Sequence, residues 1–349
     1  MKFSLNELEE KKLLELFDQH DSNVDYFLYL YRVLVDQPQL LLEVSNGKTD
    51  FENKNIAFDN LEKKYPITND FVRKSIRWDT QMLSSEHYLV NPYLKALNNL
   101  TFKEAGWTLT RVKYKAYTLC PYDEEYLYGP NYEVKMALGM FKSDYIYPSI
   151  CLYDNEWMSL NQHEIRTMEI PIQLARGKVL TLGLGLGYYA YMVSLKEEVK
   201  EVHIVEMDLE LIKLFNKYLL PLFPHPEKIH IHKADAFYFI KDIKDQDYDF
   251  IFSDLWHNVA DGYPSYLLLK KKFYDFKYTK CTYWIENSIT AYLRMLIIGV
   301  MKNEYYKNDV EYSETEQFIK DKLTNYSISG SNDIDSLLNN KGLNKIFFE

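Results

Sequence analysis

Three glycines at alternate positions, Gly183, Gly185 and Gly187, limit how this chain can fold more than any other feature. They follow an apolar run, Val179–Leu182, and precede a run of helical character, Tyr188–Leu195. Glycine allows a sharp backbone turn and close approach to a ligand, and a helix that begins behind the turn presents free N–H groups. The pattern therefore predicts a strand, a tight ligand-binding turn and a helix.

Apolar and helical runs continue to alternate after this turn. We expect further strands at Val202–Val205, Ile229–His232, Phe250–Phe252 and Thr282–Ile285, with helices at Leu209–Leu219 and from Ala236. Short apolar strands separated by helices are typical of a parallel α/β sheet. Such sheets bind ligands beyond the carboxyl ends of their strands.

The chain before the glycines has a different sequence pattern. Ser4 and Glu7 have the spacing of a capping box, and the following segment is amphipathic. Further helices are expected at Asp25–Val35, Asp70–Ser84, Pro92–Asn99 and His163–Ala175. Between them lie short β-rich segments interrupted by Pro, Gly, Asp and Asn, which predict a small antiparallel sheet. We predict an α/β protein in three parts: an N-terminal helical region (1–105), a small β-rich domain (106–160) and a Rossmann-like domain (161–349).

The composition restricts the possible partners and the compartment. Lys and Arg number 41 and Asp and Glu number 51, giving a formal charge of −10. This charge repels nucleic acid and anionic lipid, so a small molecule is the expected partner. Three distant cysteines form no disulfide framework, the first residues lack the apolar core of a signal peptide, and Leu296–Met301 is too short to span a membrane. We expect a cytoplasmic protein whose N-terminal regions serve packing or homodimer contacts.

Acidic residues follow the predicted strands one by one. Glu206 and Met207 follow the second strand, Asp235 and Ala236 the third, and Asp254 the fourth, while Glu286 ends the fifth. A carboxylate at the position of Glu206 can accept both hydroxyls of a ribose, and Asp235 can accept an adenine amino hydrogen. The sequence thus predicts a nucleoside pocket at one edge of the sheet.

The glycine spacing narrows the choice of ligand class. A dinucleotide fingerprint would place glycine where Tyr188 stands, and no Walker-type phosphate loop is present. The GxGxG form resembles the class I S-adenosylmethionine-dependent methyltransferases. The segments KVLTLGLGLGYYAY, EVHIVEMDLELI, IHKADAFYFI and YDFIFSDLW are similar, in order, to four motifs of the spermidine-synthase-like branch of that superfamily. The resemblance covers about Trp107 to Glu286.

This resemblance implies a Rossmann-like class I methyltransferase fold that binds S-adenosyl-L-methionine. The residues implied to bind the cofactor are Gly183, Gly185, Gly187, Glu206, Met207, Asp235, Ala236 and Asp254. Within this set, Glu206 would hold the ribose, Asp235 the adenine, and Asp254 would lie at the reaction centre.

Two departures from spermidine synthases decide the predicted reaction. Those enzymes carry an acid inside the glycine loop, where this chain has Leu186. They also carry a doubled aspartate after the fourth strand, whereas this chain has a single acid there, in Asp254-Leu255-Trp256-His257. We therefore predict methyl transfer to a small, unidentified acceptor, with Asp254 and His257 as candidate catalytic residues. The alternatives are an aminopropyltransferase of polyamine synthesis and a non-catalytic binding module that keeps the fold.

Histidines near the sheet raise the question of a metal. His203, His230 and His232 lie on neighbouring predicted strands, but we found no cysteine or carboxylate to complete a site, so no metal is expected. His163-Glu164 begins an HExxH pattern that Thr167 breaks. That segment is interpreted as a helix cap or a substrate-side loop.

Overall fold

The computed structural model describes residues 1–41, 48–129 and 131–349. Its helices are α1 (Glu7–Asp36), α2 (Asp50–Lys64), α3 (Asp70–Asp79), α4 (Ser85–Leu89), α5 (Pro92–Leu97), α6 (Gln162–Thr167), α7 (Glu169–Leu174), α8 (Tyr188–Ser194), α9 (Leu209–Leu214), α10 (Ala236–Phe239), α11 (Val259–Phe273), α12 (Glu286–Tyr306), α13 (Glu314–Leu323), α14 (Ser331–Leu338) and α15 (Asn340–Phe347). Its strands are β1 (Lys2–Phe3), β2 (Gln81–Leu83), β3 (Phe102–Glu104), β4 (Trp107–Tyr114), β5 (Leu119–Pro121), β6 (Tyr126–Tyr128), β7 (Glu133–Lys135), β8 (Leu138–Phe141), β9 (Tyr145–Leu152), β10 (Asn155–Ser159), β11 (Gly177–Leu182), β12 (Val199–Glu206), β13 (Ile229–Lys233), β14 (Phe250–Ser253), β15 (Lys280–Tyr283) and β16 (Ser327–Ile328).

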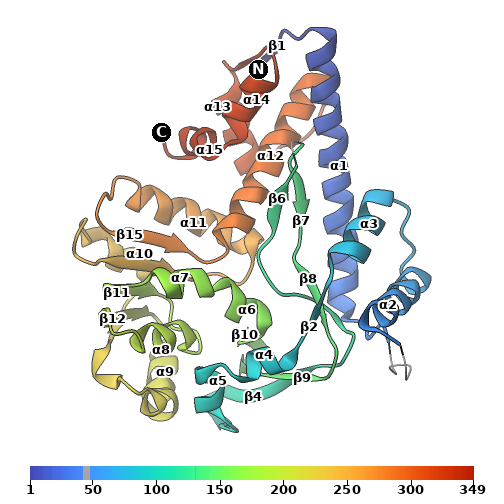
Figure 1. The fold of residues 1–349 in the computed structure, drawn as a ribbon. Coiled ribbons are helices and arrows are strands. Elements are labelled where there is room, and N and C mark those ends of the chain that lie inside the picture. Colours follow the sequence, from blue (N-terminus) through green and yellow to red (C-terminus); the bar gives the residue numbers. More distant parts are fainter. Residues whose placement is uncertain (42–47, 130) are drawn as a thin grey trace.

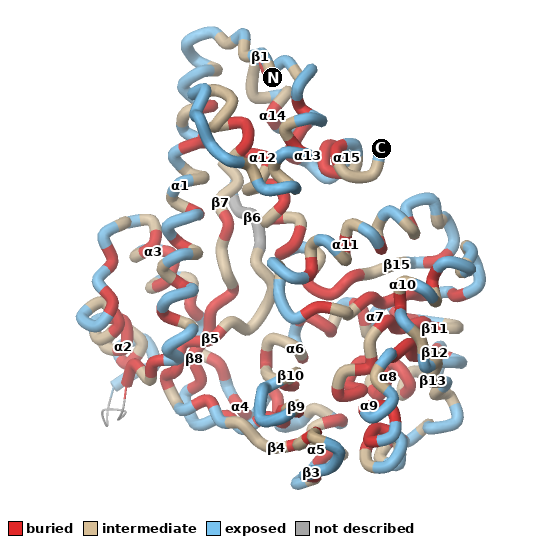
Figure 2. Tube along the Cα trace, turned by 180° about the vertical axis from the view of Figure 1, so that it is seen from behind, coloured by how far each residue is buried: buried red, intermediate tan, exposed pale blue. Residues whose placement is uncertain are grey.

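The predicted parallel sheet is confirmed, with all five strands in place. Their order is β13-β12-β11-β14-β15, and every neighbouring pair is parallel. Figure 1 shows α8 and α9 on one side of this sheet and α11 on the other. The central strands β11 and β14 are buried, as expected for a sheet covered on both faces. Figure 2 shows that the covering helix α8 is itself largely buried. The strand order changes direction between β11 and β14, which is where ligands of such sheets bind.

The predicted antiparallel sheet is also confirmed. It has the order β10-β9-β4-β3, and β4 pairs with β9 along its full length, from Trp107 opposite Leu152 to Tyr114 opposite Tyr145. It begins earlier than expected, because β3 comes from the region predicted as helical. Ala105 and Gly106 join β3 to β4 with φ of 52° and 84°, the left-handed turn that suits a two-residue hairpin. The three-part division of the chain stays a prediction.

The N-terminal helix differs from the expectation at its start. The prediction of a capping box at Ser4 was wrong. The residue that caps α1 is Asn6, whose side chain accepts a hydrogen bond from the Glu9 N–H at 3.0 Å. Ser4 is unavailable because it follows β1, and its N–H donates to the Ile328 carbonyl at 2.9 Å next to β16. From there α1 runs for 30 residues without the break expected before Asp25.

Helix α1 packs against α12, a helix from the last quarter of the chain. It runs beside α12 (Figure 1), where His20 Nε2 lies 3.1 Å from the Met295 carbonyl oxygen. Lys302 of α12 forms an ion pair with Asp21 of α1. Among the described residues, no helix is both long enough and apolar enough to cross a membrane.

Asn23 fixes α1 to the β6–β7 hairpin. Its side chain is fully buried, its Nδ2 donates to the Tyr132 carbonyl at 2.9 Å, and its Oδ1 accepts from the Val134 N–H at 3.1 Å. A buried backbone group without a partner costs about 1–3 kcal/mol, so one amide side chain here satisfies two costly groups.

We predict that Asn23→Ala lowers the free energy of unfolding by about 2–4 kcal/mol, because both backbone groups lose their partner. Urea denaturation followed by circular dichroism measures the change. Asn332→Ala, at an exposed position of α14, is the matched control and should change stability far less. Equal effects of the two substitutions would contradict the assigned role of Asn23.

Candidate functional site

A cavity of about 670 Å³ lies at the carboxyl ends of β11, β12, β13 and β14. Residues of β10, α6 and the segment that starts α12 form its other walls. Its size is that of a pocket for a small organic ligand. The carboxyl side chains that line it are Asp123, Glu125, Glu156, Glu164, Glu206, Asp235 and Asp254. No lysine or arginine is found among the described residues of its wall.

The glycine turn forms the floor of this cavity between β11 and β14. Gly183 has φ of 101°, and a Cβ there would lie 2.1 Å from the Asp254 carbonyl oxygen. Gly185 has φ of 52°, and a Cβ there would lie 2.6 Å from the Met158 sulfur. Both positions therefore need glycine for conformation and for space. The turn predicted from the sequence is present, with Asp254 directly beside it.

Glu206 connects the end of β12 to the glycine turn. Its Oε1 accepts from the Asp208 N–H at 2.7 Å, and its Oε2 accepts from the Leu184 N–H at 3.4 Å. Burial raises the pKa of the Glu206 carboxyl, and the backbone N–H groups oppose that rise by favouring the charged form. A carboxylate held from two sides in this way presents its remaining lone pairs to the cavity.

The next strand contributes Asp235 and Ala236, which also line the cavity. Asp235 Oδ1 accepts from the Tyr238 N–H at 2.8 Å and so caps α10. Met207 lines the cavity from the neighbouring strand end, with 66% of its surface exposed. The adenine-binding role of Asp235 stays a prediction, and its capping role is an addition to it.

Asp254 and Glu164 form an interacting pair of carboxyl groups deep in the cavity. Both face the empty space and so keep some accessible surface, but protein surrounds their other sides. Burial raises the pKa of Asp254 to about 7. Burial, followed by the negative charges of Asp254 and Glu156, raises the pKa of Glu164 well above its usual value. Both carboxyl groups therefore keep their protons to a higher pH than exposed acids do.

His257, the second candidate catalytic residue, lies at the rim of the cavity. Its Nδ1 is 3.3 Å from Asp261 Oδ2, and 61% of its side chain is exposed. The Trp157 ring lies edge-on to the imidazole, with centroids 6.2 Å apart. His257 is thus held by α11 and placed to contact an entering ligand. Its catalytic role stays a prediction.

Sequence reasoning missed the acids that come from the β-rich region and α6. Glu156 Oε2 accepts from the Ser149 hydroxyl at 2.9 Å, which fixes it on the wall that β10 supplies. Burial raises the pKa of Glu125 to about 7. His163 and Glu164 follow the Asn161 cap of α6, and the broken HExxH pattern was their only signal. Their place in the wall agrees with the substrate-side interpretation of that segment.

Two residues expected at this edge of the sheet do not line the cavity. Gly187 begins α8, where a Cβ would lie 2.5 Å from the Phe215 ring. Glu286 begins α12, and its Oε1 accepts from Tyr266 at 3.0 Å and from Lys270 at 2.7 Å. The placement of Glu286 as a strand-end acid of the pocket was wrong, because β15 already ends at Tyr283.

We predict a pH-dependent gain in stability for Asp254→Asn. Asp254 has a pKa of about 7 in the folded chain and about 4 when unfolded, so the folded state holds the proton more tightly. Its contribution to stability is present below pH 4 and is lost as the pH rises through 7. The melting temperature of Asp254→Asn minus that of the parent should therefore grow by at least about 2 °C between pH 4 and pH 8.

Differential scanning fluorimetry across this pH range measures the difference. Glu197→Gln, which neutralises an exposed carboxylate after α8, is the control and should show no such trend. A constant difference for Asp254→Asn at all pH values would mean that Asp254 titrates like an exposed aspartate.

Comparison with known proteins finds a family match for the segment that holds the glycine turn and the strand-end acids. The family described as "Spermine/spermidine synthase domain" matches residues 163–283. No curated protein matches the chain. Among solved structures, the chain is similar to spermidine synthase from Thermotoga maritima, with 16% identity and a TM-score of 0.32, covering 42% of this chain and 55% of that one.

Two further structures give similar values. A spermidine synthase in complex with the transition-state analogue AdoDATO has 18% identity and a TM-score of 0.30, covering 37% of this chain and 47% of that one. A probable spermidine synthase from Corynebacterium glutamicum has 13% identity and a TM-score of 0.29, covering 46% and 52%. The chain spans about half the length of these structures. Residues 163–283, which run from α6 through β15, are a spermidine-synthase-like domain.

Proposed function

We propose that this chain is an aminopropyltransferase, which moves an aminopropyl group from decarboxylated S-adenosylmethionine to a primary amine. The observation that carries the proposal is the acidic cavity wall beside the glycine turn, which has no lysine or arginine among its described residues. Four of its seven acids, Glu164, Glu206, Asp235 and Asp254, belong to the matched segment 163–283. This replaces methyl transfer, the function favoured by sequence alone, with the alternative that the family match supports more directly.

The charge of the cavity distinguishes the two donors. Decarboxylated S-adenosylmethionine carries a sulfonium and an ammonium group, whereas the intact molecule also carries a carboxylate. The described wall holds seven carboxyl side chains and no lysine or arginine that would pair with that carboxylate, and those acids that are ionised would repel it. The decarboxylated donor places only positive charge among these acids.

The cavity contains groups suited to an adenosyl ligand. Glu206 fits the ribose hydroxyls, because its carboxylate is buried and fixed by two backbone N–H groups. Asp235, at the end of the next strand, can accept a hydrogen bond from the adenine amino group. Ala236 and Phe237 form an apolar wall beside it. When bound, this donor supplies a carbon activated by a positively charged sulfur. The protein then needs to hold the amine in line with the C–S bond and to exclude water.

Asp254 is the group proposed to accept the proton. An amine enters as an ammonium ion and must lose a proton before its nitrogen can attack. The nitrogen then forms a bond to the aminopropyl carbon while the C–S bond breaks. The electron pair of the C–S bond stays on the sulfur and neutralises the sulfonium charge. A carboxyl with a pKa of about 7 exchanges protons readily at neutral pH, and burial keeps the pKa of Asp254 at this value. Glu156 further supplies an acidic side chain to the cavity wall, which Leu186 does not.

Methyl transfer from intact S-adenosylmethionine is the second candidate, and Leu186 is the observation that favours it. Its side chain is fully buried, so the glycine turn itself presents no acid to a donor ammonium group. The two reactions leave different nucleoside products. Aminopropyl transfer releases methylthioadenosine, whereas methyl transfer releases S-adenosylhomocysteine.

Product identification tests the proposal. We expect that the purified chain, given decarboxylated S-adenosylmethionine and putrescine, forms methylthioadenosine and spermidine, detected by mass spectrometry. Formation of S-adenosylhomocysteine from the intact donor, with the decarboxylated donor left unused, would establish the second candidate instead. Asp254→Asn should bind the donor within about tenfold of the parent but turn over roughly 10²-fold more slowly, because it loses basicity and keeps its shape.

A second prediction concerns donor affinity. Glu206→Gln should weaken binding of methylthioadenosine by about 1–3 kcal/mol, because a charged acceptor of two hydroxyl groups becomes a neutral one. Isothermal titration calorimetry gives the affinity. Glu210→Gln, which removes the same charge from an ion pair with Lys213 on α9, is the control. If both variants bind like the parent, Glu206 does not hold the ribose.

A further inference from the structure

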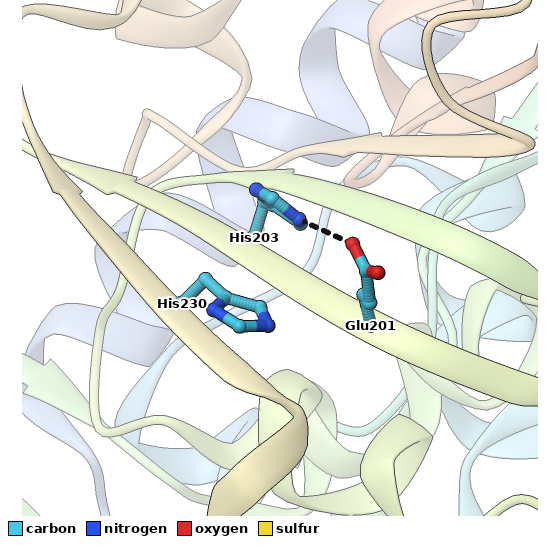
Figure 3. A group of neighbouring side chains, drawn as sticks. All are labelled: Glu201, His203 and His230. Carbon is cyan, nitrogen blue, oxygen red and sulfur yellow. Dashed lines mark hydrogen bonds and ion pairs between the residues drawn. The ribbon is translucent and has the colours of Figure 1, made fainter.

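Three histidines and a glutamate gather on one face of the parallel sheet, at its β13 edge. Glu201 and His203 lie on β12, and His230 and His232 lie on β13, with His203 directly opposite His230. Since side chains two positions apart on a strand share a face, all four extend from the same side of the sheet. The missing carboxylate of the sequence analysis is Glu201, two positions before His203. Figure 3 shows three of these side chains converging from the two strands.

The donor atoms of this cluster lie close together. One ligand atom each of Glu201, His203 and His230 lies within 4.8 Å of the other two. His203 Nε2 is 3.0 Å from Glu201 Oε2, and the ring centroids of His203 and His230 are 4.9 Å apart. The donors of a tetrahedral zinc ion are about 3.3 Å apart. Glu201 and His230 are exposed, so small side-chain rotations can close the remaining gap.

We propose that Glu201, His203 and His230 bind a divalent transition-metal ion of the zinc class, with water completing its coordination. Two imidazoles and one carboxylate are a donor set that zinc accepts. His203 coordinates the metal through Nε2. Its other ring nitrogen, Nδ1, is hydrogen-bonded to His232, whose Nε2 lies 2.8 Å away. When His203 Nδ1–H donates to His232, the Nε2 lone pair is left for the metal. A partner of this kind on the second ring nitrogen is characteristic of metal-binding histidines.

The charges around the cluster are mixed. Lys178 of β11 lies opposite Glu201, and its Nζ stacks 4.9 Å from the centre of the Tyr248 ring. Tyr248 in turn lies edge-on to His203 at 5.4 Å. The Lys178 ammonium therefore competes with a metal for the Glu201 carboxylate. Lys178→Gln should consequently tighten metal binding.

The metal site is separate from the cavity. None of its four residues lines the cavity wall, whereas Glu206 at the other end of β12 does. His203 lies three residues before Glu206, or about 10 Å along the strand. The metal thus joins β12 to the edge strand β13 and takes no part in the proposed transfer reaction. Its expected effect is to stabilise the edge of the sheet.

Zinc titration of the chelator-treated full chain, in competition with a chromogenic zinc indicator, tests the proposal. We expect one zinc ion per chain, at least tenfold weaker binding by His230→Ala and by Glu201→Gln, and about 10–100-fold weaker binding by His232→Ala. His87→Ala, an exposed histidine of α4, should bind like the parent. Zinc should also raise the melting temperature of the parent but not that of His230→Ala.

Two results would overturn the site. One is the absence of zinc binding by the parent chain. The other is binding that His230→Ala and Glu201→Gln leave unchanged, which would locate the metal elsewhere, for example among the cavity acids. Asp254→Asn identifies that case, because it would then weaken zinc binding while the cluster variants would not. His230 and Glu201 are exposed, so replacing them tests the ligands without disturbing the core.

Discussion

The close approach of two strand ends determines how the cavity is built. A Cβ on residue 183 would lie 2.1 Å from the Asp254 carbonyl oxygen, so only glycine permits β11 and β14 to end side by side. This contact brings Asp254 to the glycine turn at the point where the strand order reverses. Glu206 then holds the same turn from β12 through the Leu184 N–H. The turn is thus fixed from both neighbouring strands before any ligand enters.

The electrostatics of the cavity follow from this enclosure. Acids from the sheet edge meet acids from β10 and α6, and no lysine or arginine of the described wall balances them. Asp254 and Glu164 are consequently held away from their ordinary protonation, which costs stability near neutral pH. A ligand with two positive charges offsets that cost by pairing with both carboxylates. The same imbalance that weakens the empty protein is the basis of the selectivity for a cation that we propose.

The parts that the sequence predicted are those with a local signal. Alternating strands and helices indicated the parallel sheet, and each strand end identified its own acid, as with Glu206 and Asp235. Glu164 and Glu156 had no such signal, because antiparallel pairing of β9 with β4 and β10 brings their segment to the sheet edge. Glu201 was missed for a different reason: it precedes His203 by two residues, and only strand alternation places both on one face. Leu186 suggested methyl transfer because it leaves the glycine loop without an acid. The sequence did not indicate that Glu156 and Glu164 line the same cavity.

Proton release on diamine binding tests the central claim that the buried cavity acids retain a proton near neutral pH which a cationic acceptor displaces. Titration calorimetry of putrescine, with methylthioadenosine present at pH 7, is carried out in two buffers of different ionisation enthalpy. The account predicts a buffer-dependent heat that corresponds to release of up to about one proton, and a smaller release from Asp254→Asn, which cannot titrate at that position. Tight binding of putrescine with the same heat in both buffers would contradict the account.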